Sequence, residues 1–170
     1  MPAPHLVVTA VPVPPASLLG RLAAERSAFA DAYALSLPRR IALADFVEAF
    51  YTTRLFKLER WLLARIGRPS TDADAHALAQ GRGQRMAAWT VQARTEDELL
   101  MHEDSGATRS WFRLEADEGG GSRLYFGSAV VPRSRGPDGE PRFGILFHSL
   151  LGFHRAYSRA LLRAAARRLG

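Results

Sequence analysis

The chain has 170 residues, a hydrophobic content of 47% and a net charge of +6. This length suits one domain and the apolar content supplies a full core, which argues against disorder as the overall state. Cysteine is absent, so disulfides, a thiol nucleophile and thiolate metal sites are excluded.

Residues 1–28 are predicted to form an N-terminal arm and a short helix. Five prolines fall within the first fifteen residues, and no basic segment precedes the apolar ones. That pattern predicts neither a signal peptide nor a membrane-spanning helix, so a cytoplasmic location is the default expectation. Pro15-Ala16-Ser17 can open a helix over residues 18–27.

Residues 29–170 are predicted to form a single domain that starts with a strand and a helical block. Residues 29–37 alternate as a strand does. Residues 41–66 are strongly helical, but Thr52-Thr53 predicts a break because β-branched residues are poor in helix interiors. Gly67 suits the C-terminal cap of that block.

Beyond Arg85 the hydrophobic period changes from 3.6 to 2, which indicates strands. The segments between them are short and rich in glycine, aspartate and serine, so the strands should pair antiparallel. The four predicted strands span residues 86–93, 97–103, 108–116 and 123–131.

The last 28 residues, 143–170, predict one long helix with two unlike faces. At 100° per residue its aromatic and aliphatic side chains share one side, and His154 lies among them. Arginines at i, i+4 spacing follow the opposite side: Arg155, Arg159, Arg163 and Arg167. A helix of this length runs about 40 Å and crosses a whole sheet.

The predicted fold is therefore α+β, with an antiparallel sheet of about five or more strands gripping a long C-terminal helix. Phe153, Tyr157 and Leu161 are expected in the buried stripe of that helix. Leu151, Leu162 and Leu169 lie on its flank, where the N-terminal arm or a second protomer is expected to cover them.

The sequence resembles a bacterial domain-of-unknown-function family over residues 29–169. The resemblance is carried by Asp31 to Pro38, Glu98-Leu99, Asp104, Trp111-Phe112-Arg113, Arg123 to Phe126 and Phe153-His154-Arg155. The family belongs to the START/Bet v 1-like (SRPBCC, polyketide-cyclase-like) superfamily. Its members also occur behind NAD(P)-binding short-chain-dehydrogenase-like domains, a half that this chain lacks. Arginine in place of lysine and abundant alanine are also typical of GC-rich bacterial genomes.

The resemblance implies a helix-grip fold whose cavity, between the sheet and the terminal helix, binds a small apolar molecule. Candidate ligand-binding residues combine strand aromatics with the inward side of the helix: Trp89, Met101, Trp111, Phe112, Tyr125, Phe147, Leu150, His154 and Tyr157. No cofactor is expected.

Two other functions stay open. One is an acid–base enzyme of the cyclase or hydro-lyase type, in which His154 is the candidate catalytic residue and Glu103 or Asp104 its carboxylate neighbour. A hydrogen-bonded structural role for His154 is the alternative to catalysis. The other function is a non-enzymatic interaction module that uses the arginine face of the helix.

Metal and nucleic-acid binding are not expected. His148 and His154 lie on opposite sides of the terminal helix and cannot share a metal ion. The arginines come without a nucleic-acid-binding motif, so nucleic acid is not a predicted partner. A homodimer remains open.

Overall fold

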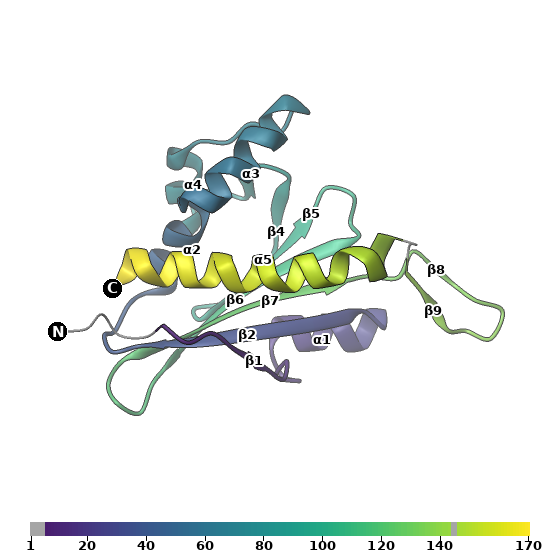
Figure 1. The fold of residues 1–170 in the computed structure, drawn as a ribbon, viewed down its shortest axis with the longest axis horizontal. Coiled ribbons are helices and arrows are strands. Elements are labelled where there is room, and N and C mark those ends of the chain that lie inside the picture. Colours follow the sequence, from purple (N-terminus) through teal and green to yellow (C-terminus); the bar gives the residue numbers. More distant parts are fainter. Residues whose placement is uncertain (1–5, 144–145) are drawn as a thin grey trace.

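The computed structural model describes residues 6–143 and 146–170, and the side chains of residues 146–150 lie outside that description. The fold is α+β, with a seven-stranded sheet and helices packed on it (Figure 1). Its elements are β1 (Thr9–Val11), α1 (Leu18–Arg26), β2 (Phe29–Leu37), α2 (Leu43–Tyr51), α3 (Arg54–Arg65), α4 (Asp72–Ala79), β3 (Arg85–Met86), β4 (Trp89–Arg94), β5 (Glu98–Glu103), β6 (Thr108–Ala116), β7 (Ser122–Val130), β8 (Ser134–Arg135), β9 (Pro141–Arg142) and α5 (Leu146–Leu169).

The helical block breaks where the two threonines predicted it. Thr53 is the N-cap of α3, because its hydroxyl accepts a hydrogen bond from the Phe56 amide at 3.1 Å. The preceding helix α2 ends at Tyr51. Gly67 adopts a positive φ of 80°, as a residue that ends a helix does. These caps turn α2, α3 and α4 into a compact cluster beside the sheet (Figure 1).

All neighbouring strands of the sheet pair antiparallel, in the order β1-β2-β7-β6-β5-β4-β3. The four predicted strands are confirmed in outline, with one difference near residue 87. Ala87 has a positive φ of 53°, so the segment predicted as one strand turns back on itself and forms the short hairpin β3–β4. The N-terminal arm adds the edge strand β1, which the sequence did not predict.

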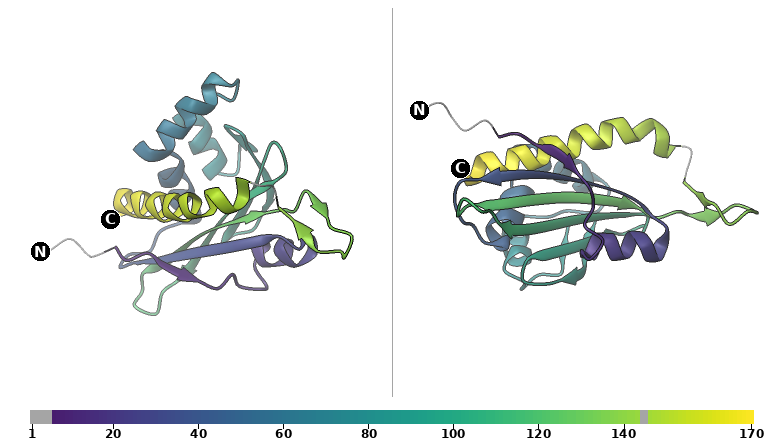
Figure 2. Two further views of the ribbon diagram at one scale, coloured as in Figure 1. Left: turned by 45° about the vertical axis from the view of Figure 1, so that its right-hand side comes forward. Right: turned by 90° about the horizontal axis from the view of Figure 1, so that it is seen from below.

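The two faces of the sheet carry separate cores. One face packs against α5, α2 and α4 and holds Tyr33, Leu99, Phe112 and Phe126. The other face packs against α1 and holds Trp111, Tyr125 and Leu100. Figure 2 (right) shows α5 and α1 on opposite sides of the sheet. The helix-grip arrangement is thus confirmed, with α5 lying along the length of the sheet.

The buried side of α5 differs from the predicted stripe. Leu162 is 0% exposed and Leu169 is 6% exposed, both within the main core beside α2. Leu6 and Val8 of the arm also pack on this core. Phe153, by contrast, is 69% exposed. The expectation that Phe153 is a core residue is wrong. Helix α2 approaches the C-terminal half of α5, so the side of α5 that carries Leu162 and Leu169 faces the core.

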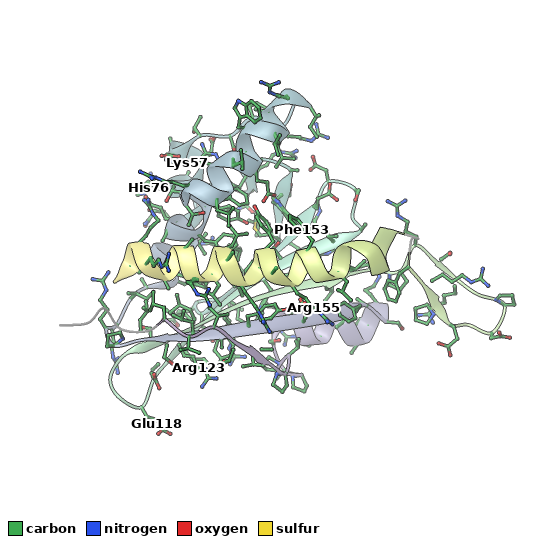
Figure 3. The ribbon with its side chains drawn as sticks, in the orientation of Figure 1. Lys57, His76, Glu118, Arg123, Phe153 and Arg155 are labelled. Carbon is green, nitrogen blue, oxygen red and sulfur yellow. The ribbon has the colours of Figure 1, made fainter. Side chains whose placement is uncertain are left out.

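The arginine face of α5 is exposed, as predicted. Two of its guanidinium groups lie over aromatic rings of β2: Arg155 over Phe29 at 5.9 Å and Arg159 over Tyr33 at 5.0 Å. Arg155 and Phe153 leave α5 on opposite sides (Figure 3). Arg155 and Arg159 therefore cover part of β2 as well as facing water.

Helix α3 turns Phe56 and Glu59 toward the protein and exposes its apolar stripe, namely Leu58, Trp61 and Leu62, with Ile66 just beyond its end. Arg65 lies 3.9 Å from the ring centroid of Trp61. Among the described residues, no helix has the length and apolar content needed to cross a membrane.

Candidate functional site

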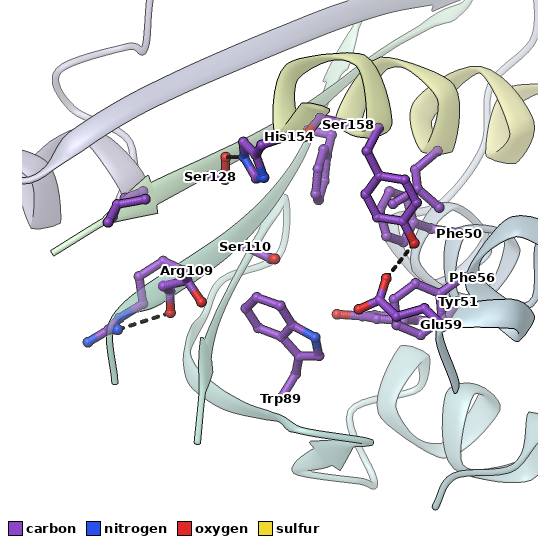
Figure 4. A pocket seen from close by; sticks show the side chains of 16 residues that line it. Phe50, Tyr51, Phe56, Glu59, Trp89, Arg109, Ser110, Ser128, His154 and Ser158 are labelled. Carbon is purple, nitrogen blue, oxygen red and sulfur yellow. Dashed lines mark hydrogen bonds between the residues drawn. The ribbon is translucent and has the colours of Figure 1, made fainter. Parts of the chain in front are cut away.

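A cavity of about 200 Å³ lies between α5, the α2–α3 corner and the sheet (Figure 4). Trp89, His154 and Tyr157 in its wall are half-buried, so the cavity reaches the surface. The lining residues are Phe50, Tyr51, Phe56, Glu59, Trp89, Thr108, Arg109, Ser110, Phe126, Ser128, Ala129, Val130, His154, Tyr157, Ser158 and Leu161.

Small side chains in the sheet create this cavity. Ser110 and Ser128 pair with each other on β6 and β7 and form its floor. Phe112 and Phe126 form the cross-strand pair two residues further along β6 and β7, on the same face of the sheet. Their rings, 5.3 Å apart, fill the space between the sheet and the helices there. Serine is much smaller than phenylalanine, so the space between the serine pair and α5 stays empty.

The wall on the α2–α3 side is aromatic and closely packed. Phe50 lies 4.6 Å from Phe126 and 6.1 Å from Phe56 between ring centroids. Tyr51 packs edge-on to Phe56 at 4.8 Å. Such interlocked rings hold the wall in one arrangement, so the cavity is a preformed feature of the fold.

Glu59 of α3 places a carboxylate in this aromatic wall. It accepts a hydrogen bond from the Tyr157 hydroxyl of α5, and Figure 4 shows it facing Trp89 and the hydroxyl of Tyr51. Burial raises the pKa of Glu59, while hydrogen bonds from Tyr157 and Trp89 oppose the shift. Burial and the nearby Glu59 raise the pKa of Tyr157 and Tyr51, so both phenols stay protonated.

The raised pKa of Glu59 predicts the pH dependence of stability. A carboxyl whose pKa is higher in the folded state stabilises the fold below its ordinary pKa of about 4.5. That contribution is lost as the pH rises through the raised value. Glu59→Gln should therefore remove part of the decline in wild-type stability that occurs between pH 4.5 and the raised pKa of Glu59. Urea unfolding across the pH range measures it, and identical pH profiles for the two proteins would show that Glu59 titrates normally.

A second polar group lies at the His154 end of the cavity. Ser128 Oγ lies 2.8 Å from Asp31 Oδ1 and 2.5 Å from His154 Nε2. Because a carboxylate only accepts, Ser128 donates to Asp31 and accepts from His154 Nε2–H. Neutral His154 is thereby assigned the Nε2–H tautomer, with its lone pair on Nδ1. Tyr33 also donates to Asp31, at 3.2 Å.

The carboxylates predicted beside His154 are elsewhere. Glu103 accepts hydrogen bonds from Ser105 in the following turn, and Asp104 forms ion pairs with Arg85 and Arg68. Asp31, acting through Ser128, is the carboxylate connected to His154. The prediction of Glu103 or Asp104 is wrong because both lie at the turn end of β5.

The predicted ligand-binding residues divide among several places. Trp89, His154 and Tyr157 line the cavity together. Met101 and Phe112 lie on the same face of the sheet but are packed inside the core, outside the cavity lining. The side chains of Phe147 and Leu150 lie outside the described residues, as does that of His148.

Trp111 and Tyr125 lie on the opposite face, so the expectation that they share the cavity is wrong. Consecutive strand residues point to opposite faces, and Phe112 occupies the inward position. Trp111 packs beneath α1 and donates from Nε1 to Glu98 at 2.6 Å. Its cross-strand partner is Gly127, where a Cβ atom would lie 2.8 Å from the indole.

Sequence reasoning missed Glu59, Tyr51 and the serine floor. Glu59 lies one turn from Leu55 and from Leu62–Leu63, so a carboxylate interrupts an apolar helix face. That interruption was the available signal. The described residues hold no group of three or more His, Asp or Glu side chains that could bind a metal ion.

Comparison of the chain with protein-family models, with curated proteins and with solved structures found no match. The resemblance to the START-like family stays a prediction.

Proposed function

We propose that the cavity under α5 binds a small organic molecule with an apolar body. The observation that carries this proposal is an aromatic-walled void that also presents polar groups, the usual make-up of a small-ligand site. Apolar cavities of about 150 Å³ hold benzene, so 200 Å³ suits a single ring with a short substituent. This is smaller than the range of about 300–1,000 Å³ common for ligand pockets.

The helix-grip arrangement supports the same location. The resemblance to START-like proteins implies a ligand between the sheet and the terminal helix, which is where the cavity lies. Ser110 and Ser158 add hydroxyl groups to its lining, and no hydrogen bond of either side chain is recorded within the described residues. Such groups suit a ligand that carries one polar substituent.

Filling the cavity should weaken binding. Ser158 lines it from α5 and is 1% exposed, so Ser158→Leu puts an isobutyl group into the void. We expect binding of benzyl alcohol, followed by ligand-observed NMR, to weaken at least about tenfold, which corresponds to about 1.4 kcal/mol.

The control is Ala160→Leu, which adds a leucine on the exposed side of the same helix and should bind as the wild type does. Thermal unfolding checks that both variants are folded. Unchanged binding by Ser158→Leu would place the probe elsewhere and contradict the proposal.

A second candidate function is acid–base catalysis on the bound molecule. It is favoured by the presence of His154 and Glu59 in one cavity, the first with a lone pair on Nδ1 and the second holding its proton to a higher pH than an exposed carboxyl does. The test is to identify a molecule that copurifies and to incubate it with the wild type and with His154→Gln. Chemical change by the wild type alone indicates an enzyme, and no change by either indicates a binding protein.

A further inference from the structure

The carboxylate of Glu59 lines the cavity and forms no ion pair within the described residues. The groups that oppose the rise in its pKa are neutral donors, Tyr157 and Trp89. The basic neighbours on its own helix pair elsewhere: Lys57 and Arg60 both bind Asp72, at 2.8 and 2.6 Å. A partly buried carboxylate without an ion pair lacks compensation by an opposite charge.

Aromatic rings surround the same carboxylate. Tyr51 contributes from α2, Phe56 from α3, Trp89 from β4 and Tyr157 from α5, and all four line the cavity. Figure 4 shows Trp89 across from Glu59, with Tyr51 next to the carboxylate. The negative faces of such rings attract a cation, most strongly where water is displaced.

We propose that the ligand carries an organic ammonium group, which binds between Glu59 and these aromatic rings. This inference rests on the proposed function, and it assigns a chemical class to that ligand. The ammonium supplies an opposite charge beside Glu59, and it can donate to the carboxylate. The apolar body of the ligand then extends along Phe126 and Leu161 toward Ser128 and His154.

The raised pKa of Glu59 makes ammonium binding depend on pH. The groups that face Glu59 are the phenols of Tyr157 on α5 and Tyr51 on α2 and the indole of Trp89 on β4. His154 of α5 lies at the other end of the cavity. Arg109 of β6 also lines the cavity, and its guanidinium donates to Gln92 and to the carbonyl oxygens of Gly106 and Thr108. The phenols stay neutral because their pKa values are raised. Affinity for an ammonium should therefore increase as the pH rises and Glu59 loses its proton.

Three probes with the same ring test the charge. Benzylammonium is positively charged, benzyl alcohol is neutral and benzoate is negatively charged. Each is titrated into the wild-type protein at mildly alkaline pH, and calorimetry measures its affinity. We expect benzylammonium to bind at least about tenfold more tightly than benzyl alcohol and benzoate to bind most weakly. Glu59→Gln should abolish the preference for benzylammonium over benzyl alcohol.

Glu25→Gln is the matched control, because it removes one exposed carboxylate on α1, across the sheet from the cavity, and should keep the preference. Equal binding of benzylammonium and benzyl alcohol, or a preference for benzoate, overturns the ammonium inference alone. Failure of all three probes to bind overturns the proposed function as well. Persistence of the preference in Glu59→Gln would also overturn the assignment to Glu59.

Discussion

Leu162→Ala is expected to lower the free energy of unfolding by about 2–5 kcal/mol, the usual cost of truncating a fully buried leucine. Leu162 is 0% exposed and lies in the core that α5 shares with α2 and the sheet. The matched variant is Phe153→Ala on the same helix. Phe153 is largely exposed and stacks on Tyr157, with ring centroids 5.8 Å apart, so its removal should cost no more than about 1.5 kcal/mol.

Urea unfolding of both variants, with equal slopes to confirm a comparable exposure of surface, measures the difference. The larger residue should give the smaller effect, because exposure and not size decides the cost. The reverse order would mean that α5 is rotated so that its aromatic stripe, as first predicted from the sequence, faces the core.

Trp111→Ala is expected to lower the free energy of unfolding by about 3–5 kcal/mol without touching the ligand cavity. Trp111 is fully buried beneath α1. Its indole shares the Glu98 carboxylate with the Leu18 amide, which donates to that carboxylate at 2.8 Å at the start of the helix. Loss of the indole therefore leaves both a void and an incompletely satisfied buried carboxylate.

The milder variant Trp111→Phe separates stability from binding. It keeps most of the ring volume and removes the donor to Glu98, so stability should fall by about 1–3 kcal/mol. Binding of benzyl alcohol should be unchanged, since the indole lies across the sheet from the cavity. Weakened binding in this variant, while the protein remains folded, would contradict the separation of the two faces.

Much of the fold could be predicted from the sequence because local signals agree with the tertiary structure. The change of period after Arg85 and the short polar turns indicated antiparallel strands, and Thr52-Thr53 marked the boundary between α2 and α3. The rotation of α5 could not be predicted in the same way. Its apolar residues extend around more than half of the helix, so the side that faces inward depends on where α2 packs.

The lining of the cavity was predicted in part. His154, Tyr157 and Trp89 line it, and they were chosen because polar or aromatic residues beside an apolar helix or strand face suit a cavity. Trp111 and Phe112 are consecutive and cannot both point inward, and the cross-strand partners Gly127 and Phe126 decide between them. Glu59 was missed because arginine, lysine and glutamate on a helix usually indicate a solvated face. Its burial comes from contact with α5, about 100 residues later in the chain.

If the cavity under α5 binds a small cationic molecule, a crystal structure grown with benzylamine shows it most directly. We expect the ring between Phe126 and Trp89, with its nitrogen about 3 Å from the Glu59 carboxylate. Occupation of the cavity by water alone, or by a benzylamine whose nitrogen points toward His154 and away from Glu59, would contradict it.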